Sequence, residues 1–151
     1  MLTPLPKYPI LAIVLMAHYP LKPAAVNFLG AGNDLDSGVS VKNVVREYTR
    51  LIDHARSKLP DAMILVNKVP YRRQDKELHR KIDELNDALS RECSKRSGCK
   101  LIDTRPKFPE QHTYARGQFV HFKEDGKVAM AKAMAAEIKK CFQPGRLITK
   151  M

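Results

Sequence analysis

Serine does not occur in this chain before Ser37, and cysteine does not occur before Cys93. Thr3 is the one aliphatic hydroxyl ahead of Ser37, and no recognisable motif surrounds it. Covalent catalysis needs an activated hydroxyl, thiol or comparable nucleophile. The first part of the chain therefore offers no ordinary serine or cysteine nucleophile.

Other signatures are missing as well. The chain has three cysteines, an odd number that argues against a complete disulfide framework, and none has the paired C-x-x-C form expected of zinc sites. No G-x-G-x-x-G or P-loop spacing follows a candidate strand, which argues against a nucleotide binder. We expect no metal and no cofactor, and a reducing compartment fits best.

The sequence contains no apolar run long enough to cross a bilayer. Residues 10–17 are apolar and follow Lys7, but such a run is too short for a membrane span. Because prolines lie on both sides of it, the pattern of a secretory signal is incomplete. The sequence predicts no transmembrane segment and a cytoplasmic location.

Positive charge is in excess, with 27 basic and 16 acidic residues and a net charge of +11. Residues 68–107 carry twelve basic and seven acidic side chains, and Tyr71-Arg72-Arg73 and Lys95-Arg96 come closest to clusters. This balance suits a nucleic acid, an anionic surface or an acidic partner. Since most of the excess falls on predicted helix faces and loops, a solvated basic surface is favoured over a dedicated nucleic-acid stripe.

Short apolar runs alternate with longer amphipathic segments. The runs at 24–29, 63–66 and 100–103 predict strands, and helical spacing of apolar residues predicts helices over 41–55, 78–93 and 124–142. Ser40 or Ser37 is expected to cap the first helix. The last helix is expected to turn one apolar side inward, made of Val128, Ala131, Met134, Ala135, Ile138 and Cys141.

Strands that alternate with helices predict a parallel sheet covered on both faces. The expected architecture is a three-layer α/β/α, flavodoxin-like fold with a mainly parallel sheet of three to five strands. At this length, residues 1–151 are expected to form a single domain.

Polar residues follow the first predicted strand, at the end where parallel sheets gather functional groups. Gly30 and Gly32 permit a tight turn and close approach of the backbone to a ligand. The amide of Asn33 can donate a hydrogen bond to a developing oxyanion. Gly32 and Asp34 are candidate substrate-binding residues, although a plain strand-ending turn would use the same residue types.

His121 lies between a proline-punctuated aromatic segment at 106–117 and the last helix, next to Val120 and Phe122. A histidine in such a partly apolar setting can act as a general base near neutral pH. The alternative is a packed histidine at a helix start. Gln118 stands three residues before it.

Taken in order, these signals resemble the SGNH (GDSL-like) hydrolase superfamily. The signals are a strand leading to Gly32-Asn33-Asp34, a Pro60-Asp61-Ala62 segment before the second strand, a helix bearing Leu85-Asn86, a strand ending Ile102-Asp103, and His121. The similarity covers about residues 23–142 and looks closest to the esterase-like domains of animal retroelements.

The resemblance implies acyl transfer from a carboxylic or acetyl ester. Asn33 corresponds to the oxyanion-hole asparagine, with Ala31 where the motif usually has glycine. His121 corresponds to the general base. Gln118 stands where the family has the aspartate that orients this base, and a glutamine carries no charge to stabilise an imidazolium.

The family's serine block, expected tens of residues before Asn33, has no counterpart. Two interpretations stay open, a fragment of a longer esterase or a degenerate copy, and both predict weak or absent hydrolysis of an ester substrate. We expect residues 10–16 to occupy the strand position left vacant. The alternative function is a non-enzymatic basic α/β domain that binds nucleic acid or an acidic partner through residues 68–107.

Overall fold

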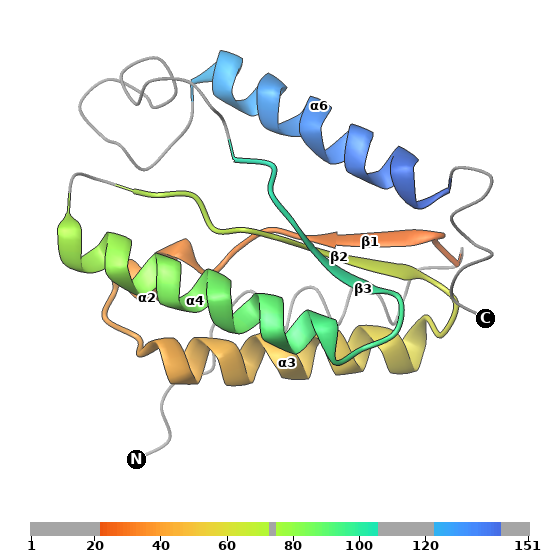
Figure 1. The fold of residues 1–151 in the computed structure, drawn as a ribbon, viewed down its shortest axis with the longest axis horizontal. Coiled ribbons are helices and arrows are strands. Elements are labelled where there is room, and N and C mark those ends of the chain that lie inside the picture. Colours follow the sequence, from red (N-terminus) through yellow and green to blue (C-terminus); the bar gives the residue numbers. More distant parts are fainter. Residues whose placement is uncertain (1–21, 73–74, 106–122, 143–151) are drawn as a thin grey trace.

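The structure, a computed structural model, describes residues 22–72, 75–105 and 123–142. Figure 1 shows three strands between two layers of helices. The elements run in the order β1 (Ala25–Phe28), α2 (Gly32–Asp36), α3 (Val41–Lys58), β2 (Met63–Asn67), α4 (Lys76–Ser94), β3 (Cys99–Ile102) and α6 (Glu124–Cys141). Residues 10–16, the predicted extra strand, lie outside the described residues.

The three strands form a parallel sheet in the order β1-β2-β3. Phe28 is paired with Val66, and Val66 with Leu101, so all three strands end at one carboxyl edge. The helices α2 and α3 connect β1 to β2, and α4 connects β2 to β3. This arrangement confirms the predicted α/β/α fold with a parallel sheet.

One face of the sheet packs against α3 and α4 (Figure 1). Apolar side chains recur along both helices at three- and four-residue spacing, so each helix has one stripe to bury. Ile52, Ile82, Leu85 and Leu89 are completely buried in a core that also contains Ile64. Cys93 is buried in the same core, as expected for a small apolar residue.

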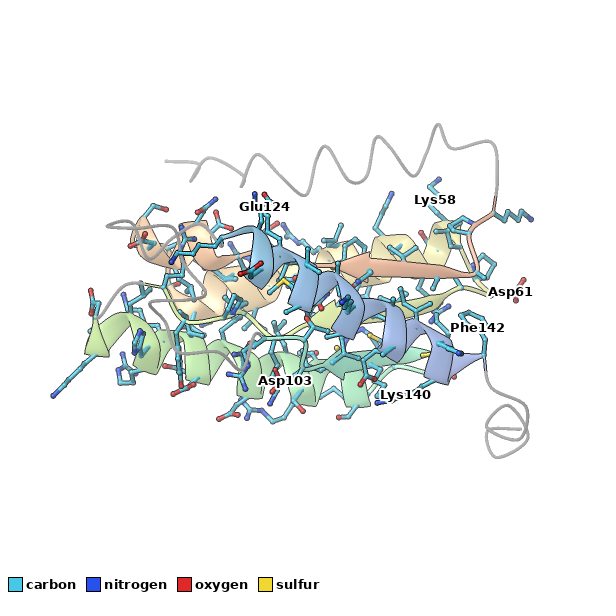
Figure 2. All side chains as sticks on the ribbon, turned by 90° about the horizontal axis from the view of Figure 1, so that it is seen from above. Lys58, Asp61, Asp103, Glu124, Lys140 and Phe142 are labelled. Atoms are coloured by element: carbon cyan, nitrogen blue, oxygen red, sulfur yellow. The ribbon has the colours of Figure 1, made fainter. Side chains whose placement is uncertain are left out.

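The other face of the sheet lies under α6. Because side chains alternate along a strand, the buried Leu65 points away from the α3–α4 core, as do Asn27 and Lys100 at neighbouring positions. An ion pair of 3.6 Å between Lys100 and Glu137 joins β3 to α6. Figure 2 views the molecule from this side, with α6 running from Glu124 to Phe142 across the sheet.

The predicted inner side of α6 is wrong in part. Val128 is 48% exposed, and Ala131 and Ala135 are exposed as well. Gly126 and Met130 are the buried residues of this helix. The physical reason is that alanine and methionine occur on all sides of α6, so the sequence contains no single dominant stripe.

Side chains define the starts of the two core helices. Ser40 caps α3, where its Oγ accepts a hydrogen bond from the Asn43 N–H at 3.2 Å. Asp75 caps α4 by accepting from the N–H groups of Glu77 and Leu78. Such caps satisfy donors that a helix start leaves without a partner within the helix. The sequence predicted the serine cap but not the aspartate cap.

A single arginine ties together the loops at the amino edge of the sheet. Arg56, near the end of α3, lies between the loop that leads into β2 and the turn that leads into β3. Its guanidinium donates hydrogen bonds to the carbonyl oxygens of Leu59, Pro60, Ala62, Ser97 and Gly98, at 2.7 to 3.4 Å. This edge is therefore fixed by one cation and many backbone acceptors.

Candidate active site

The chain leaves β1 through a strained turn at the carboxyl edge. Ala31 has φ 78° and ψ −12°, a left-handed conformation that costs a non-glycine residue about 1 kcal/mol or more. Leu35 then donates its N–H to the Ala31 carbonyl, and α2 begins. Gly30 has open space around its Cα and no positive φ, so the turn depends on Ala31 rather than on that glycine.

The short helix α2 presents the motif residues. Leu35 anchors it, because this side chain is only 2% exposed and belongs to the core. Asn33 lies on the exposed side, one residue after the helix start. Its side-chain amide is therefore accessible at the carboxyl edge, as an oxyanion donor requires.

Asp34 lies beside Asn33 and is partly buried. Burial raises the pKa of its carboxyl above the ordinary value, because desolvation disfavours the charged form. Its backbone carbonyl accepts from the Ser37 hydroxyl at 3.0 Å and from the Val39 N–H at 2.9 Å. These bonds close the turn between α2 and α3.

Gly32 faces an arginine. A Cβ on Gly32 would come within 2.8 Å of Nη1 and 3.0 Å of Cδ of Arg72, so only glycine fits here without movement of that side chain. Arg72 is itself buried, with 9% exposure, and its Nη2 lies 4.0 Å from Oδ2 of Asp36. The candidate substrate-binding residue Gly32 thus lies against the guanidinium of Arg72, which the sequence singled out only as part of a basic cluster.

A buried polar network crosses the sheet close to the same edge. Asn67, the last residue of β2, is completely buried. Its Nδ2 donates to the Phe28 carbonyl at 2.8 Å and to the side chain of Asn27, and its Oδ1 accepts from the Thr104 hydroxyl at 2.6 Å. These bonds join the ends of all three strands, just before β1 enters the motif turn.

A second asparagine extends the pairing beyond β2. The side chain of Asn86 on α4 accepts from the Val69 N–H at 2.8 Å and donates to the Val69 carbonyl at 3.0 Å. Asn86 was part of the sequence pattern that suggested the family. In the structure, Asn86 supplies the hydrogen bonds of the buried backbone N–H and C=O of Val69, which lie beyond the end of β2 and pair with none of the described strands.

His121 and Gln118, the predicted base and its neighbour, lie outside the described residues, so their placement stays a prediction. The described chain resumes at Lys123, which occupies the N-cap position of α6 without a side-chain cap hydrogen bond. Figure 1 places the start of α6 at the end of the molecule where β1 runs into α2. A base two residues before Lys123 would have to reach the same carboxyl edge to serve Asn33.

The basic residues of 68–107 are largely engaged with carboxylates. Within the described part of this stretch, ion pairs of 4.0 Å or less involve Lys68, Arg72, Arg80, Lys95, Arg96, Lys100 and Arg105. Arg96, for example, holds both Asp53 and Glu92. The two predicted clusters therefore do not form a simple cationic stripe, since Arg72 is buried and Arg96 is paired.

Two features of metal binding and membrane insertion concern the described ranges only. Among these residues, no group of three or more His, Cys, Asp or Glu side chains comes together as a metal site would need. None of the described helices combines the length and apolar character needed to cross a bilayer.

A parallel sheet between two helical layers, with a strained turn presenting an exposed asparagine at its carboxyl edge, defines a flavodoxin-like α/β domain. Residues 10–129 match the model of the GDSL-like Lipase/Acylhydrolase family. The chain belongs to this family, because the match spans most of its length. The matched range includes the apolar segment at 10–16.

Solved structures show the same fold. A mutant acetyl esterase solved with an acetate ion matches with a TM-score of 0.66 and 17% identity, over 86% of this chain and 67% of that one. A carbohydrate esterase family 3 protein from Talaromyces cellulolyticus matches with 0.65 and 17%, over 86% and 67%. The Clostridium thermocellum family 3 carbohydrate esterase matches with 0.64 and 15%, over 87% and 63%.

The chain thus spans about two thirds of the length of these structures. No curated protein matches the chain.

Proposed function

We propose that this chain carries the acyl-binding half of a GDSL-like esterase site, with Asn33 as the oxyanion donor. The observation that carries the proposal is the exposed position of Asn33 on the turn after β1, within a chain of this family. An amide held at this edge can donate to a carbonyl oxygen whose negative charge grows during acyl transfer. Gly32 and Asp34 flank it as substrate-binding residues.

His121 is the proposed general base, and Gln118 occupies the place of the residue that orients it. A glutamine can accept the imidazole N–H but cannot stabilise the imidazolium by charge. No serine precedes Ser37 in this sequence. Hydrolysis by this chain is therefore proposed to be weak or absent. Any residual hydrolysis is proposed to use water, which gives a proton to His121 as its oxygen attacks the acyl carbon, and His121 then returns the proton to the departing alcohol oxygen.

The proposed ligand is a small acetyl or carboxylic ester, or the carboxylate it releases. The similar structures include an acetyl esterase with an acetate ion and two carbohydrate esterases, and these names support a small acyl group over a long lipid chain. Acetate also offers an oxygen that Asn33 can hydrogen-bond.

The test of binding uses the full 151-residue chain labelled with ¹⁵N. Sodium acetate is titrated against sodium chloride at constant ionic strength while the amide signals are followed. The Asn33 side-chain signals and the backbone amide signals of α2 should shift saturably with acetate, and the backbone shifts should be lost in Asn33→Ala. Asn43→Ala, which removes an asparagine on α3, is the matched control and should leave binding intact. Absence of saturable shifts near Asn33 would overturn the proposed site.

The test of activity uses p-nitrophenyl acetate. The rate with the chain should stay close to the buffer rate, and any excess should disappear in His121→Ala. Fast turnover that survives in His121→Ala would contradict the assigned base. Fast turnover that is lost in this variant would contradict the proposed weakness of the site.

The alternative, nucleic-acid binding through residues 68–107, receives less support from the ion pairs of this stretch. A basic surface that binds phosphates should give a linear fall of affinity with salt on logarithmic axes. We expect little binding of an oligonucleotide even at low salt. The resemblance to animal retroelement domains and the cytoplasmic location remain hypotheses, to which the family model and similar structures add no support.

A further inference from the structure

We propose that Arg72 is a positioning residue that clamps α2 from end to end and thereby fixes the direction of Asn33. This inference rests on the proposed function of Asn33, but the contacts of Arg72 with α2 can be tested by amide exchange, independently of ligand binding. Arg72 lies in the segment that follows β2, far from α2 in sequence. Its side chain nevertheless lies against the first residue of α2 and close to the last.

The need for a clamp follows from the length of α2. A helix of five residues cannot sustain itself, because the first turn fixes several residues for very few hydrogen bonds. Leu35 anchors one side of α2 in the core. Leu35 is the one buried residue of α2, and the hydrogen bonds that follow it close only the far end of the helix. A tilt or rotation of the first residues of α2 about this anchor would redirect the Asn33 amide.

Arg72 supplies contacts at both ends of the helix. Its Nη1 and Cδ fill the space beside Gly32 so closely that a methyl group would not fit. Its Nη2 lies 4.0 Å from the carboxylate of Asp36, the last residue of α2. Two contacts separated by the length of α2 resist rotation and tilting, which one contact cannot do.

The burial of Arg72 shows that its guanidinium is not an ordinary solvated surface group. Arg72 is 9% exposed, and its buried Nε has no hydrogen-bond partner within the described part of the chain. A buried donor without a partner costs free energy. The buried guanidinium is instead used in two contacts with α2, a steric one beside Gly32 and a charged one with Asp36.

The clamp predicts coupling between Arg72 and Gly32. Gly32→Ala should collide with the guanidinium in the natural chain, whereas Arg72→Ala removes the colliding atoms. The effect of Gly32→Ala on the exchange of the Leu35 and Ser37 amides should therefore be smaller in the Arg72→Ala background. Equal effects in both backgrounds would overturn the proposed contact.

The main experiment measures amide hydrogen exchange and acetate affinity in Arg72→Met, Arg72→Lys and the natural chain. Leu35 and Ser37 donate to Ala31 and Asn33, so their exchange reports the order of α2. In Arg72→Met both amides should exchange about tenfold faster. The acetate dissociation constant should rise about fivefold, because the donor is held less firmly. Arg72→Lys keeps the charge and should recover part of both losses.

Two controls separate positioning from general loss of stability. Arg80→Met removes an exposed arginine from α4 and should change neither readout. Leu85→Ala weakens the core and should leave the acetate affinity of the folded chain unchanged. If Arg72→Met leaves exchange at Leu35 and Ser37 unchanged, the clamp is refuted. If the natural chain does not bind acetate, the proposed function fails while the exchange measurement still decides the clamp.

Discussion

At the amino edge of the sheet the charged side chain of Arg56 ties the loops together, whereas at the carboxyl edge the neutral side chains of Asn67 and Thr104 share hydrogen bonds across the strands. At the amino edge, Arg56 satisfies loop carbonyls, and the positive φ of 65° falls on Gly98, where it costs little. At the carboxyl edge, Asn67 joins the strands, and the positive φ of 78° falls on Ala31.

The two edges differ in how well their residue types suit the local backbone conformation. Local residue choice and backbone conformation agree at the amino edge. They disagree at the carboxyl edge, where an alanine adopts a glycine conformation and a donor of Arg72 stays buried without a partner among the described residues. Such disagreements concentrate at functional sites.

The largest expected effect comes from removal of the amino-edge cation. Arg56→Ala should lower the free energy of unfolding by about 3 kcal/mol, because several partly buried carbonyls lose a charged donor. Urea unfolding followed by circular dichroism measures the change. Arg50→Ala is the matched control on the same helix. Its exposed pair with Glu47 should contribute less than about 0.5 kcal/mol. Equal losses of unfolding free energy in Arg56→Ala and Arg50→Ala would contradict the role of Arg56 in holding the amino edge.

A smaller loss is expected from the carboxyl-edge network. Asn67→Ala should cost about 2 kcal/mol in urea unfolding, because the Thr104 hydroxyl loses its acceptor and the Phe28 carbonyl its donor. In Asn67→Asp the buried carboxyl should have a raised pKa, so stability should be greatest at low pH and fall as the pH rises through that value. A pH-independent difference between the two variants would contradict a buried network.

The smallest expected effect has the opposite sign. Ala31→Gly should stabilise the chain by about 1 kcal/mol, because glycine adopts a positive φ without the steric cost. Gly38→Ala is the mirror control, since Gly38 has φ 92° and should lose stability on gaining a side chain. Thermal unfolding of both variants checks the pair. A neutral or destabilising Ala31→Gly would show that the turn is not strained.

Most of the fold could be predicted because apolar spacing reports burial directly. The Leu78 to Cys93 stripe predicted α4, and the run beginning at Met63 predicted β2. The buried side of α6 could not be predicted, because alanine lies on several sides of this helix and no one side is clearly the most apolar. The helix α2 was expected to be a turn, since five residues leave no periodicity to detect.

The site was predicted less completely than the fold. Gly32, Asn33 and Asp34 were proposed from a motif; the structure places them in α2 at the carboxyl edge, and their roles stay predictions. Asn67 was missed because an asparagine that ends an apolar run looks like the first loop residue. Arg72 was noted only as part of a basic cluster, because an arginine in a basic stretch after a proline is expected to face solvent. Burial of polar groups depends on tertiary contacts that no local pattern contains.

The light packing of α6 has a consequence for the cooperativity of unfolding. Gly126 and Met130 are its buried residues, whereas α3 and α4 are each anchored by several core side chains. A helix held by so little apolar surface detaches at lower free energy than the α3–α4 unit unfolds. The domain should therefore unfold in two cooperative units, α6 at a lower free energy and the sheet with α3 and α4 at a higher one. Asn67 lies on the same face of the sheet as Leu65, the face over which α6 runs, so transient detachment of α6 would open that face to water while the strands stay paired.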